Sequence, residues 1–463
     1  MKLKSFFLPI GAAFLMPLAG CGIYISTAST NSWSDADLTA VTNVVETADI
    51  PASLTDLDVD NTFGTVRVTG TDSGPMRWTW KLNIRARTEA EAQQIASEIT
   101  CSTNLVGGRL TLAVTVPNIT QPHGIQSDFE ITVPKAASAR TRNHFGPTAI
   151  AQLNGNVEAS ARNGRVEIHN VSGHVTAGTT FDSLNVNDTG PAVLKDQNGE
   201  IQAIRIAGRL DAETSFASLL AQEIGGPAAL INRNGSVKAA GIGGALGVRT
   251  SFDSISVRDI HGAASLTNQN GRVEASSIGG PLETRTSFDS VIAHDIAGRV
   301  LVLNRNGRIE IARARGDADV RTSFDRLSVE DIDGSATLAN QNGDIEAGGV
   351  TGTVKADTSF ATLSIKGAGP EFICHNRNGA IRLHSTSTTI TNIEASTSFD
   401  NIEVHLPAGL KPAIVAHTSF GDVQSDFPVV MKPAGQSAFA EAEPAAMHAI
   451  LQNQNGNIRV RRD

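Results

Sequence analysis

The chain has 463 residues, of which 43 are glycine and only 5% are aromatic, with a single tyrosine and three tryptophans. A core built around large aromatic side chains is therefore not expected, and regular layers of small and branched side chains are the first hypothesis. The 38 basic and 47 acidic residues give a net charge of −9, which argues against a nucleic-acid partner held through its phosphates.

The N-terminus has the features of a secretory signal peptide over 1–20. Lys2 and Lys4 precede an apolar stretch over 5–19, which is too short to span a bilayer comfortably. The segment ends in Leu18-Ala19-Gly20-Cys21, which resembles the lipobox of bacterial lipoproteins. That resemblance implies cleavage before Cys21, lipidation of its sulfur and a membrane partner, and Gly22 in place of an aspartate favours an outer membrane. The alternative is an ordinary signal peptide with a coincidental cysteine.

The residues that follow the signal divide into two segments before the repeats begin. Residues 21–48 are rich in Ser, Thr, Asn and Asp, which is typical of a flexible tether. Residues 49–142 contain alternating apolar stretches and good helix formers from Thr88 to Ile99, so we expect a small β-rich capping domain with one helix. No later apolar run reaches 18 residues, which predicts no second membrane span.

Two cysteines remain after Cys21, in a compartment that permits disulfides. Two are too few for a scaffold of disulfides. Cys374 falls where neighbouring repeats carry leucine, so we expect a buried thiol there.

A repeat organises the rest of the chain. The dipeptide Asn-Gly from 198 to 378 and the tripeptide Thr-Ser-Phe from 216 to 360 each recur at intervals of 36 residues and are offset from one another by 18, with further copies of Asn-Gly at 163 and 455. The Asn of Asn-Gly falls at 163, 198, 234, 270, 306, 342, 378 and 455, and the Phe of the other motif at 216, 252, 288, 324 and 360, flanked by Phe181, Phe399 and Phe420. Short stretches of alternating apolar residues separated by glycine predict strands and turns. A unit this short buries its apolar side only by stacking on neighbours.

The predicted fold class is therefore all-β: a parallel β-solenoid of about 17 coils of 18 residues, paired into a 36-residue double repeat, over 143–463. Three prolines interrupt the period and predict a loop insertion at about 427–446, after which Ile450–Val460 resumes it. We expect Arg459, Arg461 and Arg462 to protect an exposed last coil from edge-to-edge pairing.

The corners of the coils carry two conspicuous rows. Gly271 and Gly307, and Asp253 at the equivalent corner, are expected to supply the positive φ of a tight turn. The row of Phe at 216, 252, 288, 324 and 360 is expected to fill the interior of the coils, because an exposed row would favour aggregation; an exposed stripe that binds a partner is the alternative.

Catalytic and metal motifs are missing from the sequence. His-Glu-x-x-His, Cys-x-x-Cys and Gly-x-Ser-x-Gly do not occur, so we predict no metal, no cofactor and no enzyme activity. An acidic row recurs every second coil, about 9.6 Å apart by the stacking distance, which suits carboxylate pairs of glycosidases poorly. Its members are Asp188, Glu223, Asp259, Asp295 and Asp331. We expect these carboxylates to cap the following turn.

The residue before each Asn-Gly alternates between Arg and Gln. The arginines are Arg162, Arg233, Arg305 and Arg377, and the glutamines are Gln197, Gln269, Gln341 and Gln454. This row predicts a candidate binding edge for an anionic glycan or a matching protein strip, and a solvated edge preserved by duplication is the alternative. The repeats contain neither Trp nor Tyr, which weakens a sugar-stacking function.

The order of these motifs resembles the bacterial DUF4097 family of adhesin-like proteins. The resemblance rests on Asn61–Val68, the helix start at Thr88, the strand ending at Pro134, the Asn-Gly coils, and Thr418–Val423 followed by Asn455–Val460. It implies a β-solenoid cell-envelope protein without an established catalytic activity. The leading hypothesis is a non-catalytic, lipid-anchored adhesin or interaction module that contacts a cell-surface polymer or protein. The alternatives are a periplasmic scaffold or self-assembling filament and, least favoured, a polysaccharide-cleaving enzyme.

Overall fold

The computed structural model describes residues 22–27, 40–117, 124–431, 437–439 and 447–463. The chain is an all-β parallel β-solenoid of about 15 turns with one helix in these ranges, which confirms the predicted fold class. The prediction of about 17 coils allotted 18 residues to each. Connections such as 386–391 and 407–411 are longer than the regular 279–281, so the chain makes fewer turns.

Two compact units divide the chain, Met1–Asp182 and Ser183–Asp463, and each contains strands of a sheet A and a sheet B. Sheet A of the first unit comprises β1 (Gly22–Thr27), β2 (Ala40–Asp49), β4 (Val66–Thr71), β5 (Arg77–Ala86), β8 (Gly124–Pro134), β10 (Thr148–Leu153) and β12 (Val166–Val171). Sheet B of this unit comprises β3 (Asp56–Phe63), β6 (Thr100–Val106), β7 (Arg109–Thr115), β9 (Ser138–Phe145), β11 (Val157–Asn163) and β13 (Val175–Thr179).

The second unit alternates between the two sheets along the chain. Its sheet A comprises β14 (Leu184–Thr189), β16 (Ile201–Ile206), β18 (Leu219–Ile224), β20 (Val237–Ile242), β22 (Ile255–Ile260), β24 (Val273–Ile278), β26 (Val291–Ile296), β28 (Ile309–Ala314), β30 (Leu327–Ile332), β32 (Ile345–Gly348), β34 (Leu363–Gly367), β36 (Ile381–Ser385), β38 (Ile402–Leu406), β40 (Val423–Ser425) and β44 (Ile458–Arg462). Its sheet B comprises β15 (Ala192–Asp196), β17 (Leu210–Thr214), β19 (Ala228–Asn232), β21 (Leu246–Arg249), β23 (Ala264–Thr267), β25 (Leu282–Arg285), β27 (Val300–Leu303), β29 (Ala318–Thr322), β31 (Ala336–Asn340), β33 (Val354–Thr358), β35 (Glu371–Asn376), β37 (Asn392–Phe399), β39 (Pro412–Thr418), β41 (Val430–Met431), β42 (Ser437–Phe439) and β43 (Met447–Asn455).

A regular coil of the second unit shows why the repeat folds this way. Ile255 of β22 pairs with Val273 of β24, 18 residues later, so equivalent side chains stack in columns. Ile255 and Val257 point inward and are almost fully buried, as is Ile260. The inward positions are two and then three residues apart because Asp259 adopts φ +56°, which makes a bulge that turns Ile260 back into the core.

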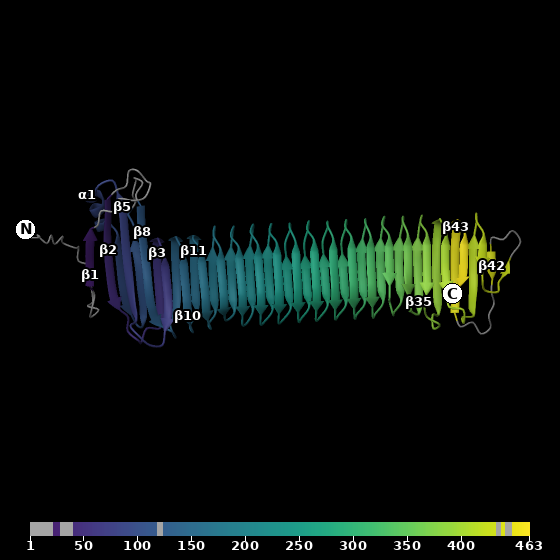
Figure 1. Cartoon of the computed structure of the whole chain (residues 1–463), viewed down its shortest axis with the longest axis horizontal. Helices are drawn as coiled ribbons and strands as arrows, with labels where there is room; N and C mark the ends of the chain where they lie inside the picture. The colour runs from purple at the N-terminus through teal and green to yellow at the C-terminus, as the bar shows by residue number, and fades with distance from the viewer. Residues whose placement is uncertain (1–21, 28–39, 118–123, 432–436, 440–446) are drawn as a thin grey trace, which may run out of the picture. The chain divides into compact units, whose positions relative to one another are not determined.

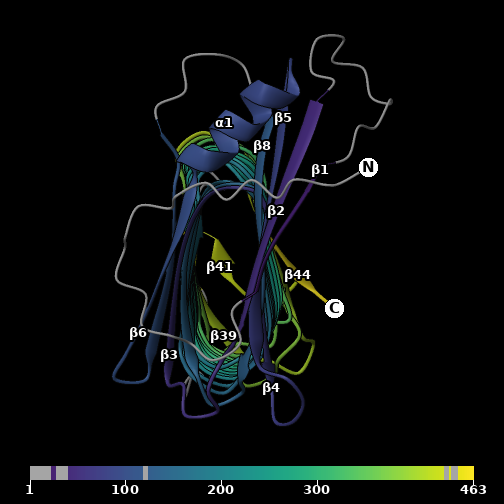
Figure 2. The same ribbon diagram turned by 90° about the vertical axis from the view of Figure 1, so that its left-hand side faces the viewer.

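The first unit adds antiparallel strands and the helix. β2 pairs antiparallel with β5, and β5 with β8, and α1 (Glu89–Glu98) packs against β2 and β5 (Figure 2). Thr88 caps α1 by accepting a hydrogen bond from the Glu91 amide at 3.2 Å, which confirms the predicted helix start. Residues 40–48, which the sequence predicted as tether, form most of β2, because its ten-residue pairing with β5 satisfies their backbone groups.

Strand order departs from chain order in both units. In the first unit, β3 lies between β7 and β9, and β4 lies between β8 and β10. In the second unit, β43 lies between β37 and β39, and β44 lies between β38 and β40 (Figure 1). The coil of 447–462 was predicted to be the exposed last coil. It is instead an inner coil, because β39 and β40, which precede it in the chain, lie one place further out.

Two further sequence predictions concern cysteines and membrane spans. Cys374 is fully buried, as predicted, and burial raises the pKa of its thiol. Cys101 is half-buried in β6, and neither cysteine is in a disulfide. Within the described ranges, no helix combines the length and the apolar character that crossing a bilayer requires.

Candidate functional site

The corner at which each coil of the second unit passes from sheet B to sheet A has two alternating forms. One reads Thr-Ser-Phe-Asp, as at 250–253, and the next reads Asn-Gln-Asn-Gly, as at 268–271. The first residue of each form is buried and fixes the corner. Asn268 donates from Nδ2 to the main-chain oxygen of Asp253 at 2.7 Å, and Thr250 donates from Oγ1 to that of Gly235 at 3.2 Å. These side chains link successive coils below the surface.

Glycine occupies the second form of corner for a different reason from the one predicted. Asp253 has φ +68°, as expected for a tight turn, but Gly271 and Gly307 have φ outside the left-handed region. A Cβ on Gly271 would lie 1.9 Å from the main-chain oxygen of Asp253 in the preceding coil. Glycine is therefore required by the close approach of two coils, and the prediction of positive φ was wrong for these residues.

The Phe residues of the first form of corner are exposed, so the prediction that they fill the interior of the coils was wrong. The interior is already filled by columns of Val, Ile, Leu and Ala such as Ile255 and Leu266, and Thr250 rather than Phe252 is the buried side chain of this corner. We call this row the aromatic edge: Phe216, Phe252, Phe288, Phe324, Phe360, Phe399 and Phe420, with exposed fractions of 50% to 77%.

Phe and Asn alternate strictly along the aromatic edge. Asn306 is bridged to Phe288 on one side and to Phe324 on the other. The alternation continues where chain order is broken, because Phe399 and Phe420 both align with Asn455 through the registers of β37, β43 and β39. Duplication of a 36-residue unit cannot produce this last step, since Asn455 lies between two Phe that precede it in the chain.

Charged rows flank the aromatic edge on both sides. The residue before each Asn of the edge supplies Arg233, Arg305 and Arg377, all exposed, alternating with glutamine. Arg233 lies 3.9 Å from Glu213, and no ion pair of Arg305 or Arg377 occurs among the described residues. The residue after the Phe supplies the acidic row on the other side, consisting of Asp253, Asp289, Asp325 and Asp400. Arg162, in β11 of the first unit, is likewise exposed.

The other acidic row, on sheet A, forms bulges. Asp188, Glu223, Asp259, Asp295 and Asp331 all have φ between 55° and 60°. The hydrogen bonds of Asp259 and Asp295 go to side chains, Arg258 in one case and Arg313 and His294 in the other. These two carboxylates therefore do not cap the following turn, although the sequence predicted that they would. Hydrogen bonds from Arg313 and then His294 lower the pKa of Asp295, whereas a general acid needs a raised pKa.

A shallow hollow of about 500 Å³ lies on sheet B of the second unit. Small side chains of Ala229, Gly247 and Ser265 form its floor, and Arg209 and Arg299 lie at its ends. Glu283 is the one carboxylate in its lining, whereas glycoside hydrolysis ordinarily takes two. In the part of the chain that the structure describes, no group of three or more His, Cys, Asp or Glu side chains is placed to hold a metal ion.

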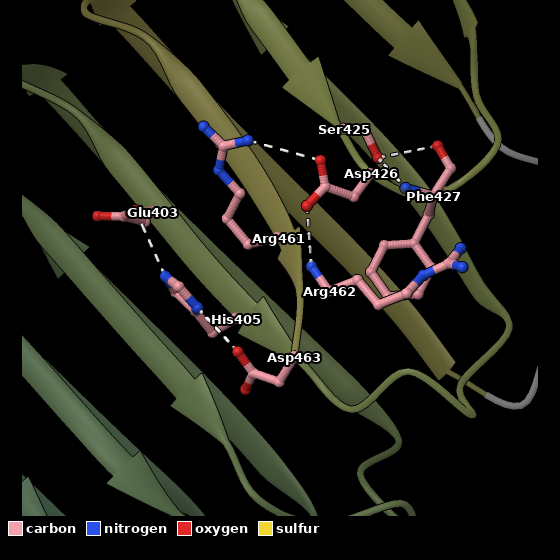
Figure 3. Close-up of polar contacts among 8 residues, drawn as sticks. All are labelled: Glu403, His405, Ser425, Asp426, Phe427, Arg461, Arg462 and Asp463. Atoms are coloured by element: carbon pink, nitrogen blue, oxygen red, sulfur yellow. Dashed lines mark hydrogen bonds and ion pairs between the residues drawn. The ribbon is translucent and has the colours of Figure 1, made fainter.

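A polar cluster that the sequence did not reveal lies at the C-terminus (Figure 3). Asp463 bonds to Nδ1 of His405 at 3.0 Å and lies 2.7 Å from Nε2 of His384. The guanidinium of Arg462 lies 4.7 Å from the ring centroid of Phe427, and Arg461 contacts Asp426. These residues come from separate coils that meet only because β44 lies between β38 and β40. The cluster fixes the end of the chain.

The predicted lipidation site, Cys21, lies outside the described residues, as does the whole of the predicted signal peptide. Lipidation therefore stays a prediction from the sequence alone.

Comparisons with known proteins found no matching family model and no matching curated protein. Three solved structures with weak similarity are a candidate cell adhesion protein from Clostridium sporogenes (7% identity, 90% of this chain and 99% of that chain covered, TM-score 0.16), a candidate adhesin from Parabacteroides distasonis (11%, 72% and 95%, 0.20) and one from Parabacteroides merdae (11%, 71% and 94%, 0.16). These values are too low to transfer a function to this chain, and the resemblance to the DUF4097 family stays a prediction.

Proposed function

We propose that this chain is a non-catalytic protein of the bacterial cell envelope, anchored by a lipid on Cys21, and that the aromatic edge and its arginines form its adhesin-like interaction surface. Its partner is a cell-surface polymer or protein. The anchor holds the chain at an outer membrane, as the resemblance of 18–21 to a lipobox implies.

The observation that carries the proposal is the regular exposure of the Phe residues. Soluble proteins seldom leave many large apolar side chains exposed along one edge unless that edge contacts a partner. Here seven Phe are at least half exposed, although the same corner carries a polar Asn in every other coil. Arg305 and Arg377 alongside provide cationic groups for an anionic partner.

Binding by the edge can be tested with the full mature chain on two probes, intact cells of the producing bacterium and polygalacturonate, an anionic polysaccharide. We expect the triple variant Arg233→Gln/Arg305→Gln/Arg377→Gln to bind both probes less, since glutamine is the native residue at this position in alternate repeats. The variant Phe288→Asn/Phe324→Asn/Phe360→Asn should also bind cells less, because it removes three exposed rings of the same edge.

A matched control removes three positive charges from sheet A instead, in Arg258→Gln/Lys366→Gln/Arg382→Gln. Equal loss of binding in this control would show that net charge alone matters and would refute the edge as the site.

Anchoring and orientation need separate measurements. The Cys21→Ser variant should leave the membrane fraction, and its retention there would refute the lipid anchor. Protease added to intact cells should digest the wild-type chain if it faces outward. Complete protection would favour the alternative of a periplasmic scaffold over an adhesin.

A further inference from the structure

The spacing of the aromatic edge suits a partner with rings at the same spacing. Successive Phe residues lie two coils apart, about 9.6 Å at the usual distance between paired strands. A partner ring placed at the level of the intervening Asn would lie about 4.8 Å from the Phe above and the Phe below. That separation falls within the range of about 4.5–7 Å that aromatic pairs prefer.

The first unit contains an example of this packing within one chain. Phe63 of β3 and Phe145 of β9 occupy the equivalent corner of adjacent coils, in the sequences Asn-Thr-Phe-Gly and Asn-His-Phe-Gly. Their rings stack with centroids 5.3 Å apart and an interplanar angle of 16°. Rings one coil apart at this corner therefore stack, and the second unit omits every other ring of such a stack.

A second copy of the chain supplies rings at the required spacing along the whole edge. Two edges interleave when one is displaced by a single coil, so that each Phe faces an Asn of the other. A half-exposed Phe has roughly 100 Å² to bury. Seven of them contribute about 700 Å² per copy, close to the roughly 800 Å² per partner of a stable interface.

The flanking charges favour a parallel over an antiparallel arrangement. When two parallel copies face each other, the arginine row of each lies opposite the Asp row of the other. With a displacement of one coil, Arg305 of one copy faces Asp289 of the other, and the arginines of that other copy face Asp253, Asp325 and Asp400. An antiparallel arrangement places arginine row against arginine row, with Ser and Gln opposite and no carboxylate. Complementary rows of charge fix the register of an interface.

We infer that the aromatic edge binds a second copy of this chain, in parallel and displaced by one coil, with the Phe rings interleaved and the arginines facing the corner aspartates. The inference rests on the proposed function, because it names the partner of the same edge.

The oligomeric state of the full mature chain, with Cys21→Ser to keep it soluble, tests the pairing by sedimentation equilibrium. We expect a dimer whose dissociation constant rises at least tenfold in Phe288→Asn/Phe324→Asn/Phe360→Asn. The variant places the native alternate residue at each corner, so the fold should persist, and circular dichroism checks this. The control Val106→Asn/Ile231→Asn/Ile450→Asn removes three exposed apolar side chains of sheet B and should leave the dimer intact. A monomeric wild type, or equal dissociation of both variants, would overturn the inference.

The orientation is tested by single introduced cysteines on a Cys21→Ser/Cys101→Ser background, with Cys374 buried. Asn234→Cys, Asn306→Cys and Asn378→Cys are introduced one at a time and treated with a short bismaleimide. In the parallel arrangement each residue lies near its own counterpart, so all three should form covalent dimers. Cross-linking of Asn306→Cys alone would mean an antiparallel pair and would overturn the proposed arrangement.

The failure of this inference is distinguishable from the failure of the proposed function. A monomeric wild type that still loses cell binding on Arg→Gln substitution leaves the edge as an interaction surface with a different partner. A dimer that binds neither cells nor polysaccharide supports the pairing and refutes the adhesin-like role.

Discussion

The regular coils from β14 to β36 and the closing segment from β37 to β44 have the same kinds of residue at their corners. Their strands, however, follow the chain in different orders. In the regular coils, each strand pairs with the strands one coil earlier and one coil later, and the paired residues are typically 18 apart. In the closing segment, β43 pairs with β37 and β39, both earlier in the chain. Yet the corner of β43 carries Asn453, Asn455 and Gly456, the set that its place in the stack requires. The comparison teaches that the spatial neighbour, rather than the sequence neighbour, selects the corner residue.

Removing residues 447–463 should have the largest effect, because this deletion removes β43 and β44, the two strands whose position differs from chain order. Without β43 and β44, the strands β39 and β40 lose their parallel partners. We expect residues 412–425 to lose all hydrogen-exchange protection, while β24 and β25 in the regular coils keep theirs. A chain lacking only Asp463 is the control. Unchanged protection of β39 in the truncated chain would contradict the inner position of β43.

Glycine-to-alanine substitutions test whether the same steric rule holds in both regions. A Cβ would lie 1.9 Å from a main-chain oxygen at Gly271 and 2.0 Å from one at Gly456. We expect either substitution to lower the free energy of unfolding by about 1–3 kcal/mol, measured by urea denaturation followed by circular dichroism. Gly247→Ala, where nothing lies within 4 Å, should change stability little. If Gly456→Ala left the free energy of unfolding unchanged while Gly271→Ala lowered it, the corners of the two regions would not be equivalent.

The buried corner asparagines provide a second test of equivalence. Nδ2 of Asn268 and of Asn453 each lies 2.7 Å from a main-chain oxygen of the neighbouring coil. Substitution by alanine removes this bond and leaves a buried oxygen without a donor, at an expected cost of about 1–3 kcal/mol. Substitution by threonine should cost less, since Thr250 occupies the equivalent corner. Denaturation midpoints measure the loss of stability in the alanine and threonine variants. Equal losses in the two would show that the hydrogen bond is unimportant.

The smallest expected effect is a pH dependence confined to the closing segment. The hydrogen bond with Asp463 raises the pKa of His405, and the bond with His405 lowers the pKa of Asp463. The contribution of His405 is complete below its unfolded pKa of about 6.5 and is lost as pH rises through the raised folded pKa. That of Asp463 is present above its unfolded pKa of about 3.9 and is lost as pH falls through the lowered folded pKa. Stability of β44 should therefore peak at mildly acidic pH.

Exchange protection of β44, corrected for the intrinsic rate, measures this dependence, with β24 as the internal reference. His384 and Glu403 also contact the cluster, so His405→Gln is the variant that isolates one ring. It should flatten the decrease in protection above neutral pH. An identical pH profile for β44 and β24 in the wild type would show that the cluster does not couple to folding.

The sequence predicts whatever depends on local pattern. Alternating apolar residues at an 18-residue period identify the coils, Thr88 identifies the start of α1, and leucine at the equivalent position of earlier 36-residue repeats identifies Cys374 as buried. These predictions succeed because each rests on residues close in the chain or on exact repetition.

What the sequence did not predict depends on contacts between coils. The required absence of a Cβ at Gly271 comes from an oxygen of the preceding coil. Phe252 is exposed because the interior is already filled by columns that include Ile255 and Leu266. The alternation from Phe399 through Asn455 to Phe420 is visible only once the strand order is known. One signal in the sequence could have predicted the exposed Phe row. Every coil already supplies Ile and Val to the interior, which leaves no room there for a column of Phe.

The inner position of β43 and β44 also determines when the C-terminal end of the solenoid can be completed during synthesis. The regular coils can fold one after another as the chain emerges, since each needs only the coil before it. The place between β37 and β39 must stay open until the last residues are made, and β3 of the first unit must likewise wait for β7 and β9, far later in the chain. Completion of either segment is therefore a long-range event that follows coil-by-coil growth, and we expect the slowest folding phases to belong to these two segments.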